Sequence, residues 1–163
     1  MYLKRIIPIL LLILISSCSG DEKVVDMKQE VQHDDYFYSV EGYYKADEIA
    51  KEKASGTFYV VTFKVTNRAK RVDHPWENSI AYVVDEKGKE YHNLPEKQKL
   101  LNTIIPFNLK DRHITKAGET ETTVFVFDIP NNVKQPYLKY NGEFLMGDMF
   151  DGNQFKHARI KLF

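Results

Sequence analysis

The only thiol of the chain lies where an aliphatic segment gives way to a charged one. Cys18 follows the aliphatic residues 6–15 and comes just before Asp21. A lone cysteine cannot form an internal disulfide, so the chemistry open to this position is modification of its sulfur. Because Lys4 and Arg5 precede the aliphatic segment, the order of residues is that of a secretory signal peptide. The segment has about half the ~20 apolar residues that a bilayer-spanning helix needs, so we expect it to be removed.

The residues just before the cysteine indicate which modification it receives. The order Ile15-Ser16-Ser17-Cys18 resembles the bacterial lipobox, in which the thiol receives a diacylglycerol and the cysteine becomes the mature N-terminus. We therefore predict a lipoprotein signal peptide over residues 1–17 and lipidation of Cys18. Each buried methylene contributes about 0.8 kcal/mol, so two or three acyl chains on one residue would anchor the protein durably in a membrane. The alternative is an ordinary secretory signal followed by an incidental free cysteine.

The next segment predicts a tether and a location. Residues 19–35 carry many charges, no aromatic side chain and no sustained hydrophobic period, so residues 18–35 are predicted to be the lipidated cysteine and a flexible tether. Asp21-Glu22 is similar to the export signal on surface lipoproteins of the Bacteroidetes. We expect a lipid-anchored protein of the bacterial cell envelope, in the outer membrane, facing either the periplasm or the cell surface.

Composition and motifs exclude several classes of protein. The 163 residues contain 23 basic and 23 acidic side chains, and loss of the signal removes Lys4 and Arg5, so the mature chain gives no support for a nucleic-acid partner. The sequence contains no Gly-x-Ser-x-Gly elbow, phosphate-binding glycine loop or dinucleotide fingerprint. We therefore predict a protein that is not an enzyme and that needs no cofactor.

One cluster of histidine and aspartate residues could bind a metal ion. His33, Asp34 and Asp35 are adjacent, and His157 is a further nitrogen ligand that folding could bring to them. No histidine pair has the spacing of a zinc site, so the simpler interpretation is solvated loop residues. Metal binding through these four residues is kept as an alternative function.

Large apolar side chains in predicted loops indicate contact with a partner. Trp76 follows a small basic cluster that includes Arg71, and Met149 and Phe150 precede the last predicted strand. Aromatic and methionine side chains at loop tips bury a large area per ordered side chain, which favours binding. The alternative is that Trp76 and Phe150 fold back to cap the core.

Strand patterns fill the rest of the chain. From Thr57 to Asn67, residues Tyr59, Val61, Phe63 and Val65 alternate with residues that become polar, which is typical of a half-buried strand. Further strands are predicted at residues 36–44, 78–84, 120–129, 137–140 and 158–162, with a tight turn at 85–88. Short helical turns are predicted at residues 45–54 and 95–103. Residues 36–163 should therefore form an all-β, antiparallel immunoglobulin-like β-sandwich with one or two helical turns in its connections.

Three stretches of this domain resemble a known family. They are Gly56-x-Phe58-x-Val60-Val61-x-Phe63-x-Val65-x-Asn67, Val84-Asp85-x-x-Gly88-x-x-Tyr91, and Ala117-Gly118-Glu119 leading to Val126-Phe127-Asp128-Ile129-Pro130. They resemble the telokin-like family of bacterial secreted proteins and lipoproteins of unknown function. The resemblance implies an immunoglobulin-like sandwich related to the mycobacterial immunogenic extracellular proteins, and it transfers no catalytic residue.

The sequence thus predicts a lipid-anchored, non-catalytic envelope protein whose domain presents loops to another envelope protein or to an extracellular ligand. Its membrane contact is the lipid on Cys18. The alternative function is a metal-binding or metal-handling envelope lipoprotein.

Overall fold

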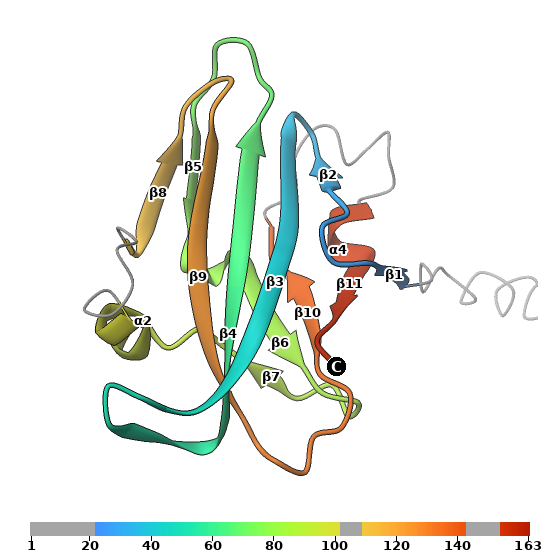
Figure 1. Ribbon diagram of the computed structural model, residues 1–163. Helices are drawn as coiled ribbons and strands as arrows, with labels where there is room; N and C mark the ends of the chain where they lie inside the picture. The colour runs from blue at the N-terminus through green and yellow to red at the C-terminus, as the bar shows by residue number, and fades with distance from the viewer. Residues whose placement is uncertain (1–21, 102–108, 143–153) are drawn as a thin grey trace, which may run out of the picture.

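Two β-sheets pack face to face around the main core of the computed structural model (Figure 1), which describes residues 22–101, 109–142 and 154–163. The first sheet has the order β2 (Val31–His33), β3 (Tyr36–Ile49), β4 (Glu52–Asn67) and β9 (Thr120–Ile129). The second has the order β1 (Lys23–Val25), β11 (Ala158–Lys161), β10 (Tyr137–Tyr140), β6 (Ala81–Val84) and β7 (Glu90–Tyr91). A separate two-stranded ribbon joins β5 (His74–Glu77) to β8 (Arg112–Thr115). The described helices are η2 (Asn78–Ile80), α2 (Pro95–Leu101) and α4 (Gln154–His157).

The alternation predicted for residues 57–67 sets the core. Tyr59, Val61, Phe63 and Val65 are buried in the main cluster between the sheets. The opposite face of the same strand carries Phe58 and Val60, which are also buried, in a second cluster with Leu101 of α2. The helix covers this outer face (Figure 1), which explains why both faces of the strand are apolar in its first half. The predicted all-β sandwich and the helical turn near residues 95–103 are confirmed.

The turn predicted at residues 85–88 closes the β6–β7 hairpin. Gly88 has φ +79°, a conformation that glycine adopts without steric cost, and its N–H donates to the Asp85 carbonyl at 3.0 Å. The Asp85 carboxylate accepts from the N–H groups of Lys87 and Lys89 at 2.8 and 2.9 Å. These backbone hydrogen bonds lower the pKa of Asp85 below its usual value, so the turn is fixed by an ionised side chain.

The helical turn predicted at residues 45–54 is wrong. These residues continue β3 and β4 into one long hairpin, in which Ile49 pairs with Glu52 across the two-residue loop Ala50-Lys51. Both loop residues have positive φ, +48° and +70°, as the tightest hairpin turn requires. Alanine, lysine and glutamate favour helices when nothing else decides, but here β-sheet pairing along the flanking strands overrides that preference.

The tether predicted over residues 18–35 is corrected from Lys23 onward. Residues Lys23–Val25 pair in parallel with β11, and Val31–His33 pair with β3. Val25 and Val31 are buried in the main core. Strands of three residues are too short to show a period of two, and the partner of β1 lies at the far end of the sequence, so no local pattern reveals them.

Replacing the β3–β4 loop by residues that tolerate positive φ should stabilise the protein. The double substitution Ala50→Asn and Lys51→Gly removes the steric cost of two left-handed residues, so the free energy of unfolding should rise by about 1 kcal/mol in urea denaturation. Lys53→Gly, two residues further along β4, is the control and should lower it by about 0.5–1 kcal/mol. A loss of stability in the double variant would contradict this description of the turn.

Candidate functional site

A pocket of ≈ 720 Å³ opens beside the β5–β8 ribbon, and we call it the His74 pocket. It lies between the ribbon, η2 and the start of β3. It is lined by the following residues: His33, Tyr36, Tyr38, His74, Pro75, Trp76, Glu77, Ser79, Ile80, Arg112, His113, Ile114, Asn141 and Gly142.

His74 forms one wall of the pocket with two tyrosines. Its Nε2 lies 2.7 Å from the Tyr38 hydroxyl, and its ring stacks on Tyr36 with centroids 3.7 Å apart. Burial, with a smaller contribution from His33, lowers the pKa of His74 to about 4. Burial also raises the pKa of Tyr38. At neutral pH both partners are therefore uncharged, and this wall offers aromatic surface and neutral hydrogen-bonding groups.

Trp76 forms a second wall. The structure agrees with the alternative interpretation, in which this side chain packs on the core, but places it in a strand and not in a loop. Trp76 belongs to β5, pairs with His113 of β8, and is only 5% exposed. Its indole stacks on the His113 ring with centroids 3.8 Å apart and planes 6° apart. Its Nε1–H donates to Thr115 Oγ1 at 2.9 Å. β8 could not be predicted, because Arg112–Thr115 is short and three of its four residues are polar, and without β8 the tryptophan has no partner strand.

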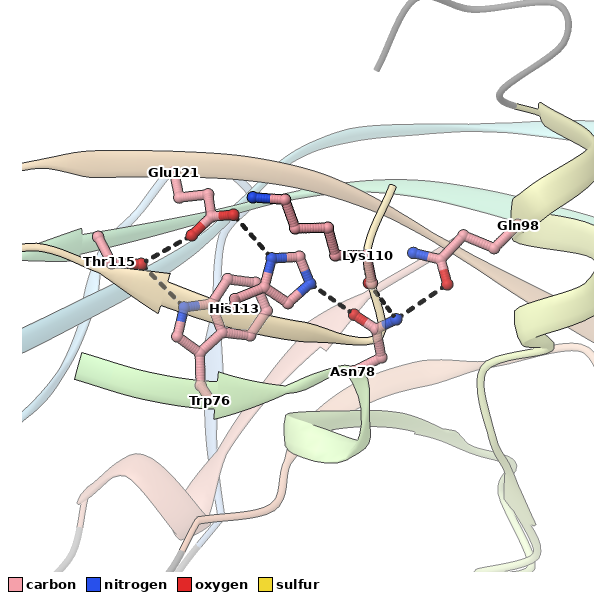
Figure 2. Close-up of polar contacts among 7 residues, drawn as sticks. All are labelled: Trp76, Asn78, Gln98, Lys110, His113, Thr115 and Glu121. Atoms are coloured by element: carbon pink, nitrogen blue, oxygen red, sulfur yellow. Dashed lines mark hydrogen bonds and ion pairs between the residues drawn. The ribbon is translucent and has the colours of Figure 1, made fainter. Parts of the chain in front are cut away.

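His113 is held at both ring nitrogens (Figure 2). Nε2 lies 3.0 Å from Asn78 Oδ1, and Nδ1 lies 2.8 Å from Glu121 Oε1. The second Glu121 oxygen accepts from the Thr115 hydroxyl at 3.2 Å. An amide oxygen can only accept, so Nε2 carries a hydrogen, and the contact with Glu121 then requires one further proton on His113 or on Glu121. The ring is thus fixed in position, and its Nε2 is fixed as a hydrogen-bond donor.

The orientation of Asn78 follows from a backbone group. Its Nδ2 donates to the Lys110 carbonyl at 2.9 Å and to Gln98 Oε1 at 3.0 Å (Figure 2). A carbonyl cannot donate, so the amide cannot be reversed, and Asn78 Oδ1 must face His113.

A second backbone group fixes the other end of the chain of hydrogen bonds. Val126 N–H donates to Asn93 Oδ1 at 2.9 Å, so Asn93 Nδ2 faces Gln98 and donates to Oε1 at 2.9 Å. Gln98 Oε1 therefore accepts from two amides. The network links β9, α2, η2 and the ribbon, and we call it the His113 network. Its polar residues are isolated in the sequence, so only their burial in the fold identifies them.

The rim of the pocket combines an ion pair with an exposed apolar side chain. Arg112 Nε lies 3.0 Å from Glu77 Oε1, and both side chains are largely exposed. Ile114, between Arg112 and Thr115 on β8, is 66% exposed. Because the ion pair lies in solvent it contributes little stability, so its consequence is polarity at the pocket mouth.

The other predicted contact residues do not join this site. Arg71 is exposed and is not among the pocket residues. Met149 and Phe150 lie outside the described residues, as does Cys18. Among the described residues, no helix is both long and apolar enough to cross a lipid bilayer.

The structure does not assemble the predicted metal ligands. His33 is 3% exposed and stacks on Phe155 with ring centroids 4.4 Å apart, whereas Asp34 and Asp35 are exposed. Within residues 22–101, 109–142 and 154–163, no three histidine, cysteine or acidic side chains converge as a metal site. The histidine instead packs as an aromatic core residue, because β2 places it against α4.

These features define a β-sandwich protein with an immunoglobulin-like arrangement. The chain belongs to the family described as domain of unknown function DUF4352, whose model matches residues 25–151. No curated protein matches the sequence significantly.

Three solved structures share the fold at low sequence identity. The yjhA protein of Bacillus subtilis has a TM-score of 0.59 and 10% identity, over 85% of this chain and 98% of that one. The secreted protein MPT63 of Mycobacterium tuberculosis has a TM-score of 0.57 and 13% identity, over 88% and 99%. An uncharacterised β-sandwich protein of Clostridium difficile has a TM-score of 0.50 and 11% identity, over 90% and 99%. The resemblance to an immunoglobulin-like family of unknown function, related to mycobacterial secreted proteins, is confirmed.

Acid should destabilise the protein through His74. The pKa of this side chain is about 4 in the folded protein against 6.5 without the fold, so the unfolded chain binds the proton more tightly. Its contribution to stability is complete above about pH 6.5 and is lost as the pH falls towards 4, by about 1–2 kcal/mol after allowance for partial exposure. His74→Gln should flatten this part of the pH–stability curve. His92→Gln at an exposed position is the control, and equal curves for the two variants would contradict the assignment.

Proposed function

We propose that this protein is a lipid-anchored, non-catalytic lipoprotein of the cell envelope whose sandwich binds a ligand in the His74 pocket. The observation that carries the proposal is the pocket itself, with ≈ 720 Å³ of space and aromatic walls that contain a few fixed polar groups. Concave, largely apolar sites with convergent polar groups are the usual form of small-molecule sites. The ligand is either free outside the cell or a side chain of another envelope protein.

The chemistry of the walls narrows the class of ligand. The Tyr38–His74 pair is neutral, and the Trp76–His113 stack has its polar atoms engaged in the His113 network. Charged groups face the pocket only at the rim, where Arg112 and Glu77 already pair. An uncharged, ring-sized group with one or two polar atoms matches these walls, because it gains aromatic contact without leaving a buried charge unpaired.

Trp76 provides a direct readout of this pocket, because it is the only tryptophan in the chain. The uncharged aromatic dye N-phenyl-1-naphthylamine should bind saturably, with quenching of Trp76 emission and a rise in dye emission. Ser79→Tyr fills the mouth from an exposed position and should weaken dye binding at least tenfold, equivalent to about 1.4 kcal/mol.

The matched control is Ser55→Tyr, the same substitution at an exposed position outside the pocket. It should bind the dye as the unaltered protein does. Non-saturable binding, or equal affinity in the two variants, would contradict the proposal that the His74 pocket binds a ligand.

The anchor is the second part of the proposal. The basic residues, the aliphatic segment and Ile15-Ser16-Ser17-Cys18 support lipidation of the sulfur, and a secreted mycobacterial protein among the structural relatives agrees with a place outside the cytoplasm. The outer membrane is the proposed site, with the domain facing the periplasm or the surface.

Mass spectrometry of the protein from bacterial membranes should find a diacylglyceryl-modified cysteine at the mature N-terminus. Cys18→Ala should move the protein from the membrane fraction to the soluble or unprocessed fraction, because the acyl chains supply the membrane affinity. Ser19→Ala, one residue further on, should remain in the membrane fraction. An unmodified thiol in the native protein would refute the anchor.

A further inference from the structure

The outer face of the β1-β11-β10-β6-β7 sheet combines basic and aromatic side chains. The alternation that buries Leu138 and Ile160 places Tyr137 and Lys139 of β10, and Arg159 of β11, on the outside. The outer face of the other sheet is covered in part by α2, whereas none of the described helices packs on this one (Figure 1).

Ring and cation contacts gather these side chains into one patch. The Arg159 guanidinium lies 4.5 Å from the centre of the Tyr137 ring, and Phe163 meets that ring edge-on with centroids 5.4 Å apart. Lys161 Nζ lies 6.0 Å from the centre of the Phe163 ring. Phe163 is 50% exposed, and Val24 beside Arg159 is 40% exposed. We call Val24, Tyr137, Arg159, Lys161 and Phe163 the Tyr137 patch.

Basic side chains outnumber acidic ones on this face. Lys139, Arg159 and Lys161 lie on it, and the Glu22 carboxylate lies 2.6 Å from Lys139 Nζ and 3.0 Å from Arg159 Nη1. Glu90 at the β7 edge adds a second carboxylate, and its neighbour His92 is charged only when protonated. Aromatic rings and long basic side chains on one surface suit a membrane interface, where the apolar parts enter the headgroup layer and the cations meet phosphate.

The covalent anchor fixes where this face lies. Glu22 is the fourth residue after Cys18, so the chain between them reaches no further than about 14 Å. Glu22 is itself held against Lys139 and Arg159 on the outer face. Since β1 is part of the fold, the domain cannot stand off the bilayer as a long tether would allow.

We propose that the Tyr137 patch docks on the surface of an anionic bilayer, with the lipidated cysteine beside it. This inference rests on the anchor of the proposed function. Each basic side chain near an anionic surface adds to the electrostatic attraction, and a few of them are enough to orient a domain that is already anchored. The β5–β8 ribbon lies across the molecule from β1 and β11 (Figure 1), so a docked domain would hold the ribbon away from the strand that follows the anchor.

The test uses the lipidated full-length mature protein in vesicles of phosphatidylethanolamine and phosphatidylglycerol. The native sulfur is acylated, so Val84→Cys or Ile114→Cys supplies one reactive thiol for a fluorophore. Val84 lies opposite Tyr137 on β10, and Ile114 is the matched residue on the ribbon. A headgroup-quencher lipid should quench the label at residue 84 several-fold more strongly than the label at 114.

Lys161→Glu with Phe163→Ser should abolish this difference while the protein still sediments with the vesicles. Equal quenching of the two labels in a sedimenting protein overturns the docked orientation and leaves the anchor standing. Quenching that is as strong on phosphatidylcholine alone overturns the recognition of anionic headgroups. Failure to sediment overturns the anchor and the docking together.

Discussion

The hydrogen bonds of His113 with Glu121 and Asn78, together with the packing of Trp76 on Phe63, hold the β5–β8 ribbon on the sandwich. Two strands of four residues each are too short to be stable alone, so the ribbon depends on its contacts with the rest of the fold. Those contacts bury an imidazole, an indole and a carboxamide, and each buried polar atom needs a partner to offset the loss of water. The His113 network supplies these partners from β9, η2, α2 and the residue at 110 (Figure 2), so one set of hydrogen bonds joins four separate parts of the chain.

The pocket follows from that attachment. With the ribbon fixed, its residues His74, Trp76 and Ile114 line the pocket together with Tyr36 and Tyr38 of β3. The side-chain nitrogens of Trp76, Asn78 and His113 are already engaged in hydrogen bonds. The hydrogen-bonded pair of His74 and Tyr38, which also lines the pocket, is uncharged at neutral pH. The site is therefore suited to recognition of shape and aromatic surface. At the other edge of the molecule, β1 brings the proposed lipid anchor close to the domain.

Much of the sandwich could be predicted from local patterns. The strand at 120–129, the strand at 137–140 and the turn at Gly88 match the structure, because alternation and glycine act over a few residues. The elements that were predicted wrongly do not depend on local patterns. The Ala50-Lys51 turn, the strand Lys23–Val25 and the burial of Trp76 all depend on a partner distant in sequence or on pairing that overrides residue preference. For the site, Trp76 and His33 could be singled out from the sequence, and packing of Trp76 on the core is one of two interpretations. The burial of His33 and the stacking partners of both could not be predicted, since β8 and α4 supply those partners.

The most direct test of this account is hydrogen–deuterium exchange of the Asn78→Asp variant beside the Asn131→Asp variant. At residue 78 a carboxylate would face the Lys110 carbonyl and Gln98 Oε1, two acceptors, whereas at residue 131 the contact with the Thr57 hydroxyl needs only an acceptor. The account predicts faster exchange in β5 and β8 of the first variant, with β3 and β4 as protected as in the second. Unchanged protection of β5 and β8 would show that the His113 network does not hold the ribbon.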